Sequence, residues 1–87
     1  MIELSARVQA APGLFFGHAY RITINKDVII GTHVNIHGGV LIGQENRGVR
    51  KGTPIIGDYV WIGINAAIVG NIKIGNDVLI APNSFVN

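Results

Sequence analysis

Branched aliphatic residues recur along this chain every six positions. One series starts at Ile24, and after a single longer step the same phase resumes at Ile56. A six-residue step turns about 600° on a helical wheel, which would scatter these residues around a helix. Short strands with inward side chains two apart fit the pattern instead, because a second apolar or small residue stands two positions before each one. The series is Ile24, Ile30, Ile36, Ile42, Ile56, Ile62, Ile68, Ile74, Ile80 and Val86.

This hexapeptide period predicts an all-β fold, a parallel β-solenoid. We expect one domain, residues 1–87, made of an irregular first coil (1–21) and regular coils (22–43 and 54–87). The small residue after most core isoleucines is expected to let the chain turn. Because a solenoid needs covered ends and the repeat runs to Val86, we expect the C-terminal cap to be missing from these residues. In the first coil, Leu4, Ala10 and Phe16 are assigned to the first apolar position of successive units, which is the position two residues before the core isoleucine.

One step of the repeat is too long. From Ile42 to Ile56 the chain takes fourteen residues where six would do, so eight residues within 44–53 must loop out. An insertion in a strict solenoid often marks a binding face, and we predict a protruding loop there. A tolerated surface excursion is the alternative, since lengthening a flexible loop costs only about 0.6 kcal/mol per doubling.

Composition excludes several classes of function. Hydrophobic residues make up 48% of the chain but are dispersed, so no run approaches the roughly 20 apolar residues that span a bilayer. A chain without cysteine or a leader pattern is expected in the cytoplasm. The net charge of +2 is mild, and basic residues gather only at Arg47, Arg50 and Lys51. We therefore expect neither a membrane nor a nucleic-acid partner.

Three segments carry a resemblance to a known family. His18–Ile24 reads HAYRITI, Pro54 re-enters the repeat two residues before a core isoleucine, and Ile62–Gly75 reads IGINAAIVGNIKIG. With the repeat, they resemble the hexapeptide-repeat acyltransferases, and within them the serine acetyltransferase type. The resemblance implies a single-stranded left-handed β-helix, three subunits side by side, and acetyl transfer from acetyl-CoA to a hydroxyl. The protruding loop would shape the acceptor pocket.

The resemblance also assigns site residues. His18 would be the general base, a role that suits imidazole because its unperturbed pKa is about 6.5, and Glu3 would be its orienting carboxylate. Acetyl-CoA would lie in a groove beside Gly43, Gly63, Ile64 and Pro82, although turns alone would also explain the glycines. The acceptor would lie near Gly17, His37 and Thr53. Thr53 replaces a histidine and Gly17 replaces an acidic residue of the family, so the acceptor stays open between serine and a sugar hydroxyl.

The remaining candidate residues have competing interpretations. With 18 residues per coil, His37 should lie one coil from the residue after His18, and it could line the cleft or serve the turn. His33 is expected on the surface. Trp61 and Tyr59 alternate with inward residues and should face outward, where a subunit contact of a homotrimer would cover them.

Two other functions compete with the transferase. A non-catalytic solenoid or scaffold segment would keep the repeat without the chemistry. A γ-type carbonic anhydrase shares the fold and binds zinc through three histidines, but spacings of fifteen and four between His18, His33 and His37 do not match that family. We therefore predict no metal.

Overall fold

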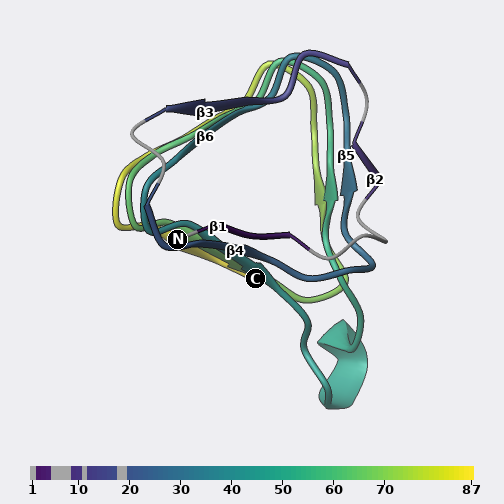
Figure 1. Cartoon of the computed structure of the whole chain (residues 1–87). Coiled ribbons are helices and arrows are strands. Elements are labelled where there is room, and N and C mark those ends of the chain that lie inside the picture. The colour runs from purple at the N-terminus through teal and green to yellow at the C-terminus, as the bar shows by residue number, and fades with distance from the viewer. Residues whose placement is uncertain (1, 5–8, 11, 18–19) are drawn as a thin grey trace.

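The chain folds as a triangular solenoid whose described strands form three parallel sheets (Figure 1). The computed structural model describes residues 2–4, 9–10, 12–17 and 20–87, with residues 2–4, 9–10 and 50 described by their backbone alone. Each coil adds one strand to each sheet, so strands three apart in sequence order lie side by side. This confirms the all-β solenoid.

The sheets are named here after one of their strands. The β4 sheet contains β1 (Ile2–Leu4), β4 (Ile22–Ile24), β7 (Leu41–Gly43), β10 (Ala67–Val69) and β13 (Phe85–Val86). The β5 sheet contains β2 (Gln9–Ala10), β5 (Ile29–Ile30), β8 (Ile55–Ile56) and β11 (Lys73–Ile74). The β6 sheet contains β3 (Phe15–Gly17), β6 (Asn35–His37), β9 (Trp61–Ile62) and β12 (Leu79–Ile80). The one described helix is the 3₁₀ turn η1 (Gly48–Arg50).

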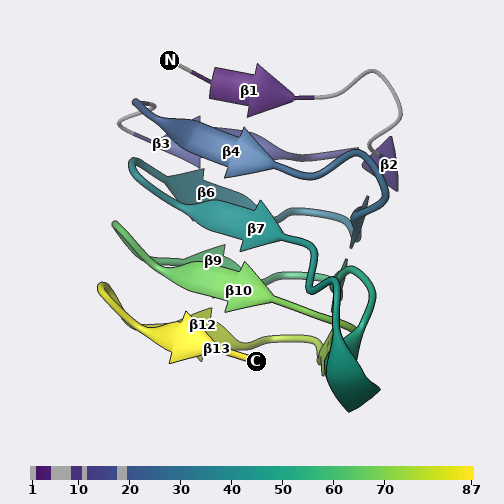
Figure 2. The ribbon, with the colours of Figure 1, turned by 90° about the horizontal axis from the view of Figure 1, so that it is seen from below.

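The coils wind to the left. Figure 1 looks along the solenoid from its N-terminal end, and the chain runs anticlockwise as it recedes toward the C-terminal coils seen in Figure 2. Parallel strands are joined by right-handed crossovers in almost all other folds. The handedness expected from the family resemblance is therefore confirmed.

Three corners join the sheets. The loop corner leads from the β4 sheet to the β5 sheet and comprises residues 25–28, 44–54 and 70–72. The Tyr59 corner leads from the β5 sheet to the β6 sheet and comprises residues 31–34, 57–60 and 75–78. The His37 corner leads from the β6 sheet back to the β4 sheet, at the ends of β3 and β6, and comprises residues 38–40, 63–66 and 81–84.

The predicted stripe of isoleucines fills the inside of the triangle. Ile30, Ile62 and Ile74 are 2%, 0% and 8% exposed, and each pairs in register with a core residue of a neighbouring coil. Branched aliphatic side chains thus stack into one continuous core, and burying each side chain stabilises the fold by about 1.5–3 kcal/mol relative to leaving it in water. The same layering buries the residue two positions before the core isoleucine in most units, including Pro54 and Val60.

The first coil is longer than predicted. Phe16 pairs with Ile36, twenty residues on, whereas Ile24 pairs with Ile42, eighteen residues on. Two additional residues therefore fall between β3 and β4, and they shift the phase of everything before them. The assignment of Leu4, Ala10 and Phe16 to the first apolar position was wrong: these residues pair with Ile24, Ile30 and Ile36, at the core-isoleucine position.

At Gly31, Gly57 and Gly63, glycine after a core isoleucine serves close packing of coils more than turning. A Cβ on Gly57 would lie 2.7 Å from the carbonyl oxygen of Gly75 on the next coil, which leaves no room for a side chain. The turn itself is made two residues later, where Tyr59 takes a left-handed φ of 56° and donates its N–H to Thr32 O. Left-handed residues also stand three positions after a core isoleucine elsewhere. They are His33 and Asp77 at the Tyr59 corner, and Gly39, Asn65 and Asn83 at the His37 corner.

The predicted insertion leaves the solenoid between β7 and β8 and is the segment that projects from the triangle in Figure 1. Ile42 and Ile68, on neighbouring coils, are 26 residues apart, and Ile24 and Ile42 are 18 apart, so eight residues are extra. In the described part of the chain, η1 is far too short a helix to cross a bilayer.

Candidate functional site

Gly17 and His37 lie directly against each other at the His37 corner. They are register partners in β3 and β6, and a Cβ on Gly17 would lie 2.7 Å from His37 Cε1 and 2.8 Å from Nδ1. The expectation that His37 stands one coil from the residue after His18 was wrong, because the longer first coil pairs His37 with Gly17 instead. The imidazole therefore fills the space that a side chain at Gly17 would need.

The other side of the His37 imidazole packs on Trp61. Their ring centroids are 4.5 Å apart with the planes tilted by 46°. Nε2 of His37 is buried and finds no hydrogen-bond partner among the described residues. Burying such a nitrogen unpaired is costly, so a hydrogen-bond partner for this atom is expected at the corner.

The catalytic pair expected from the resemblance is placed only in part. His18 lies outside the described residues, and it follows Gly17 at the end of β3 in the sequence. The backbone of Glu3 lies in β1, where its register partner is Thr23 of β4. Their roles stay predictions.

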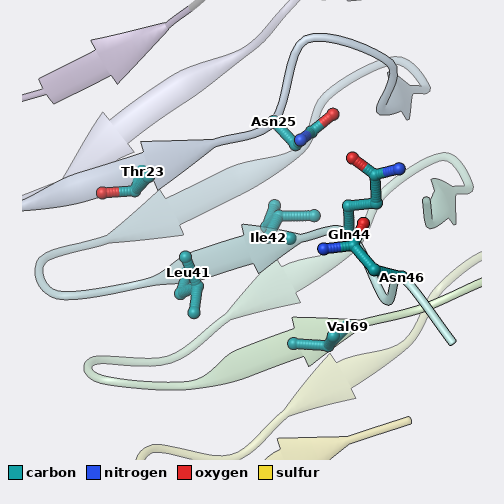
Figure 3. Close-up of a pocket in the computed structure, with 8 residues that line it drawn as sticks. Thr23, Asn25, Leu41, Ile42, Gln44, Asn46 and Val69 are labelled. Atoms are coloured by element: carbon teal, nitrogen blue, oxygen red, sulfur yellow. The ribbon is translucent and has the colours of Figure 1, made fainter. Parts of the chain in front are cut away.

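A pocket of about 410 Å³ opens at the loop corner, on the outer face of the β4 sheet (Figure 3). Alternation along the strands turns Leu41 outward from β7, while the loop brings Gln44 and Asn46 over the same surface. We call this the loop-corner pocket. Its walls are Thr23, Asn25, Leu41, Ile42, Gly43, Gln44, Asn46 and Val69.

The loop beside this pocket is closed at its base. Glu45 and Gly52 exchange two backbone hydrogen bonds, of 3.0 and 2.9 Å. Glu45 Oε1 also accepts the N–H groups of Asn46 and Arg47, and Thr53 Oγ1 donates to Asp27 O at 3.2 Å. Only the tip is free of the body: Val49 is 99% exposed. The base thus holds Gln44 and Asn46 in place beside the pocket.

The residues expected to bind acetyl-CoA separate into two groups. Gly63 and Pro82 stack at the His37 corner, where a Cβ on Gly63 would lie 2.6 Å from Pro82 N, and Ile64 is exposed beside them. Gly43 stands at the far end of the β4 sheet, in the loop-corner pocket. Packing within the chain explains Gly63. It does not explain Gly43, whose Cβ would meet nothing closer than 3.8 Å.

The acceptor residues separate in the same way. Gly17 and His37 lie at the His37 corner, and Thr53 lies at the loop corner. Within one chain the two corners are at opposite ends of the β4 sheet, so the structure does not gather the predicted residues into a single site (Figure 1).

The remaining aromatic and histidine predictions concern the Tyr59 corner and the β6 sheet beside it. His33 is exposed there, as expected, and stacks on Tyr59 with ring centroids 4.9 Å apart and planes within 2° of parallel. Tyr59 is 59% exposed, and Trp61 is half-buried on the outer face of the β6 sheet, so both face outward as predicted. His33 and His37 thus occupy different corners and face different rings.

Sequence reasoning named Gly43 and the loop, but few of the other individual side chains that line the pocket. Asn25, Gln44 and Asn46 were not singled out, because hexapeptide spacing describes the core and not the outer face. One signal was available: Asn25 takes the position after a core isoleucine that glycine holds one coil later at Gly43. A polar residue there, next to the insertion, marks the site.

Comparison with known proteins points to one family. The family model for the bacterial transferase hexapeptide (six repeats) matches residues 53–87. Serine acetyltransferases of Staphylococcus aureus (strain N315) and Staphylococcus epidermidis (strain ATCC 12228 / FDA PCI 1200) are each 36% identical over 85 residues. Those residues are 98% of this chain and 40% of each relative, so the chain spans well under half the length of the curated relatives it matches.

Solved structures agree with the sequence matches. Serine acetyltransferase isoform 3 from Entamoeba histolytica, in complex with cysteine, gives a TM-score of 0.88 at 29% identity over 99% of this chain and 30% of its own. The Neisseria gonorrhoeae serine acetyltransferase gives 0.85 at 30% identity, over 98% of this chain and 34% of its own. The Brucella abortus enzyme in complex with coenzyme A gives 0.85 at 28% identity, over 94% and 33%.

Proposed function

Because the chain belongs to the hexapeptide-repeat, serine acetyltransferase-like family, we propose that it carries the catalytic coils of an acetyl-CoA-dependent O-acetyltransferase acting on a hydroxyl of serine or a sugar. One observation on this chain supports the proposal independently of the family. Gly43 needs no glycine for its own packing, yet it lies in a pocket beside the only described loop that leaves the solenoid. Space kept clear at that place suits the thioester end of acetyl-CoA, which must meet the acceptor hydroxyl in the same pocket.

The proposed reaction is general-base catalysis. An alcohol is a poor nucleophile at neutral pH, so the His18 imidazole would accept the hydroxyl proton as the oxygen attacks the thioester carbonyl. The new C–O bond forms, the C–S bond of acetyl-CoA breaks, and the imidazolium returns its proton to the departing sulfur. The Glu3 carboxylate would orient the ring and stabilise its charged form. A base positioned in this way contributes about 10²- to 10⁴-fold in rate.

The proposed assembly is a homotrimer of side-by-side solenoids. The base follows Gly17 at the His37 corner, whereas the pocket and Gly43 lie at the loop corner. A neighbouring copy that sets its loop corner against the His37 corner would join the two halves into one site with acetyl-CoA in the groove between them. Outward apolar residues on the β6 sheet, among them Phe15 at 56% and Leu79 at 68% exposed, support burial against another copy.

The protein is proposed to act in the cytoplasm, in keeping with the absence of cysteine from its 87 residues. That absence also simplifies the test. Release of free thiol from acetyl-CoA can be followed with a thiol reagent, because the chain adds no thiol of its own.

The test is thiol release in the presence of serine and of a panel of sugars, with product identity checked by mass spectrometry. Acceptor-dependent release with an O-acetylated product is expected. Its absence with every acceptor would reject the transferase and favour a non-catalytic solenoid segment.

A further inference from the structure

The loop-corner pocket offers only neutral groups. Its polar walls are the Thr23 hydroxyl and the side-chain amides of Asn25, Gln44 and Asn46, while Leu41 and Val69 contribute apolar surface. None of the described residues that line it is ionisable. Its volume of about 410 Å³ lies in the range of small-molecule sites.

The described charged residues of the loop do not line the pocket. Glu45 uses Oε1 to hold the backbone N–H groups of Asn46 and Arg47, which are loop contacts. Arg47 and Lys51 are exposed and do not line the pocket. The Thr53 hydroxyl is bonded to a main-chain carbonyl of the solenoid body. The described walls that this chain contributes therefore present no fixed charge to a ligand in the pocket.

This distinguishes two classes of acceptor. Free serine carries an ammonium and a carboxylate, and moving either from water into a pocket without an opposite charge is unfavourable. A sugar carries hydroxyls, each a donor and an acceptor, and side-chain amides present both. The apolar face of a pyranose ring can lie on Leu41 and Val69 while the amides above bind its hydroxyls.

We infer that the acceptor is an uncharged sugar, bound in the loop-corner pocket by the amides of Asn25, Gln44 and Asn46. The inference rests on the proposed function for its chemistry. The acetyl group passes from the sulfur of acetyl-CoA to a sugar oxygen, whose proton leaves through the base to the thiol product. Binding of the sugar to the pocket does not depend on that step.

Steady-state kinetics with sugars and with serine as acceptors test the inference. With acetyl-CoA present, kcat/KM for at least one neutral hexose or N-acetylhexosamine is expected to exceed that for serine by about tenfold or more. Faster acetylation of serine than of every sugar would overturn the inference and leave the transferase intact. The absence of thiol release with every acceptor would reject the proposed function, and the binding experiment would then decide the inference by itself.

Binding is measured without acetyl-CoA, by ligand-observed NMR or calorimetry with the same sugars and with serine. Gln44→Glu places a carboxylate in the pocket at nearly constant shape, and we expect sugar affinity to fall about tenfold. Asn76→Asp adds the same charge at an exposed position of the Tyr59 corner, where a carboxylate can still accept the Asp58 N–H, and it should leave the affinity unchanged. The assignment would be contradicted if Gln44→Glu left the sugar affinity unchanged, or if serine bound more tightly than every sugar.

Discussion

The imidazole of His37 occupies the place of a side chain at Gly17. The two residues are partners across β3 and β6, and a Cβ on Gly17 would lie 2.7 Å from His37 Cε1. Because the ring is backed by Trp61 at 4.5 Å, it has little room to withdraw. The residue preceding the proposed base is thus kept small by a histidine one coil away.

Gly17→Ala is therefore expected to destabilise the fold by about 1–3 kcal/mol, the usual cost of an extra methyl group in a packed region. In a His37→Ala background the space is free, and the same change should become neutral or stabilise by about 0.4–1 kcal/mol through the unfolded chain. Urea unfolding of the four variants measures the coupling. Equal effects of Gly17→Ala in both backgrounds would show that the contact is not a constraint.

How far the sequence predicts this structure depends on which side of the strands a residue faces. Inward positions follow a period of six, so the buried faces of Ile30, Ile62 and Ile74 and the length of the insertion were predictable. The two-residue lengthening before Ile22 was not, because Leu4, Ala10 and Phe16 fit the period equally well at either apolar position. The repeat carries no information on the outer face, where the pocket lies.

The separation of the candidate site between two corners was also beyond prediction. Family motifs name residues such as Gly43 and Gly63 together, although the solenoid places them at opposite ends of the β4 sheet. Spacing along one chain cannot indicate that residues meet across a subunit boundary. The Gly43 and Gly63 backbones can, however, be distinguished by what surrounds them.

Gly43→Ala and Gly63→Ala should therefore behave differently. At Gly43 a methyl group meets only ordinary contacts at 3.8 Å or more, so stability is expected to stay within about 1 kcal/mol of the parent while KM for acetyl-CoA rises several-fold. At Gly63 the methyl group would meet the Pro82 backbone, and a loss of about 1–3 kcal/mol is expected. Thermal unfolding and thiol-release kinetics measure both; a Gly43→Ala enzyme with unchanged KM would remove this residue from the cofactor site.

His18→Ala is expected to lower kcat by about 10²- to 10⁴-fold, since it removes the proposed base. Its matched control is His33→Ala, which truncates an exposed histidine at the Tyr59 corner. Circular dichroism should report intact strands in both variants. Full turnover by His18→Ala would exclude the assigned role, and an equal loss in His33→Ala would indicate a general effect of losing an imidazole.

Removing residues 45–52 should preserve the solenoid. The deletion shortens the step from Ile42 to Ile56 from fourteen residues to the six of every regular unit, and Glu45 and Gly52 already lie side by side at the loop base. The far-ultraviolet spectrum and the unfolding transition are expected to stay close to those of the parent. Acetyl transfer should be lost, because the deletion takes away Asn46 and the support of Gln44. A deleted chain that retains full activity would place the acceptor elsewhere.

The assembly can be tested by combining two inactive chains. His18→Ala damages the His37 corner and the 45–52 deletion damages the loop corner, so each variant keeps the half-site that the other lacks. In a symmetric trimer that joins these corners between copies, random mixing at equal amounts makes about a quarter of the sites whole. Coexpressed chains should then recover about that fraction of the parent activity, while separately purified chains stay inactive.

Light scattering on the same samples gives the number of copies, and a trimer is expected. Activity that fails to return in mixed trimers would mean that each chain builds its own site, in which case the base and the loop-corner pocket could not act on the same acceptor. Activity above that of the Gly17→Ala chain, in its mixture with His18→Ala, would contradict the assembly in another way, because both changes fall in the same half-site. That pair is therefore the control: its mixed trimers should show no gain over the more active chain alone.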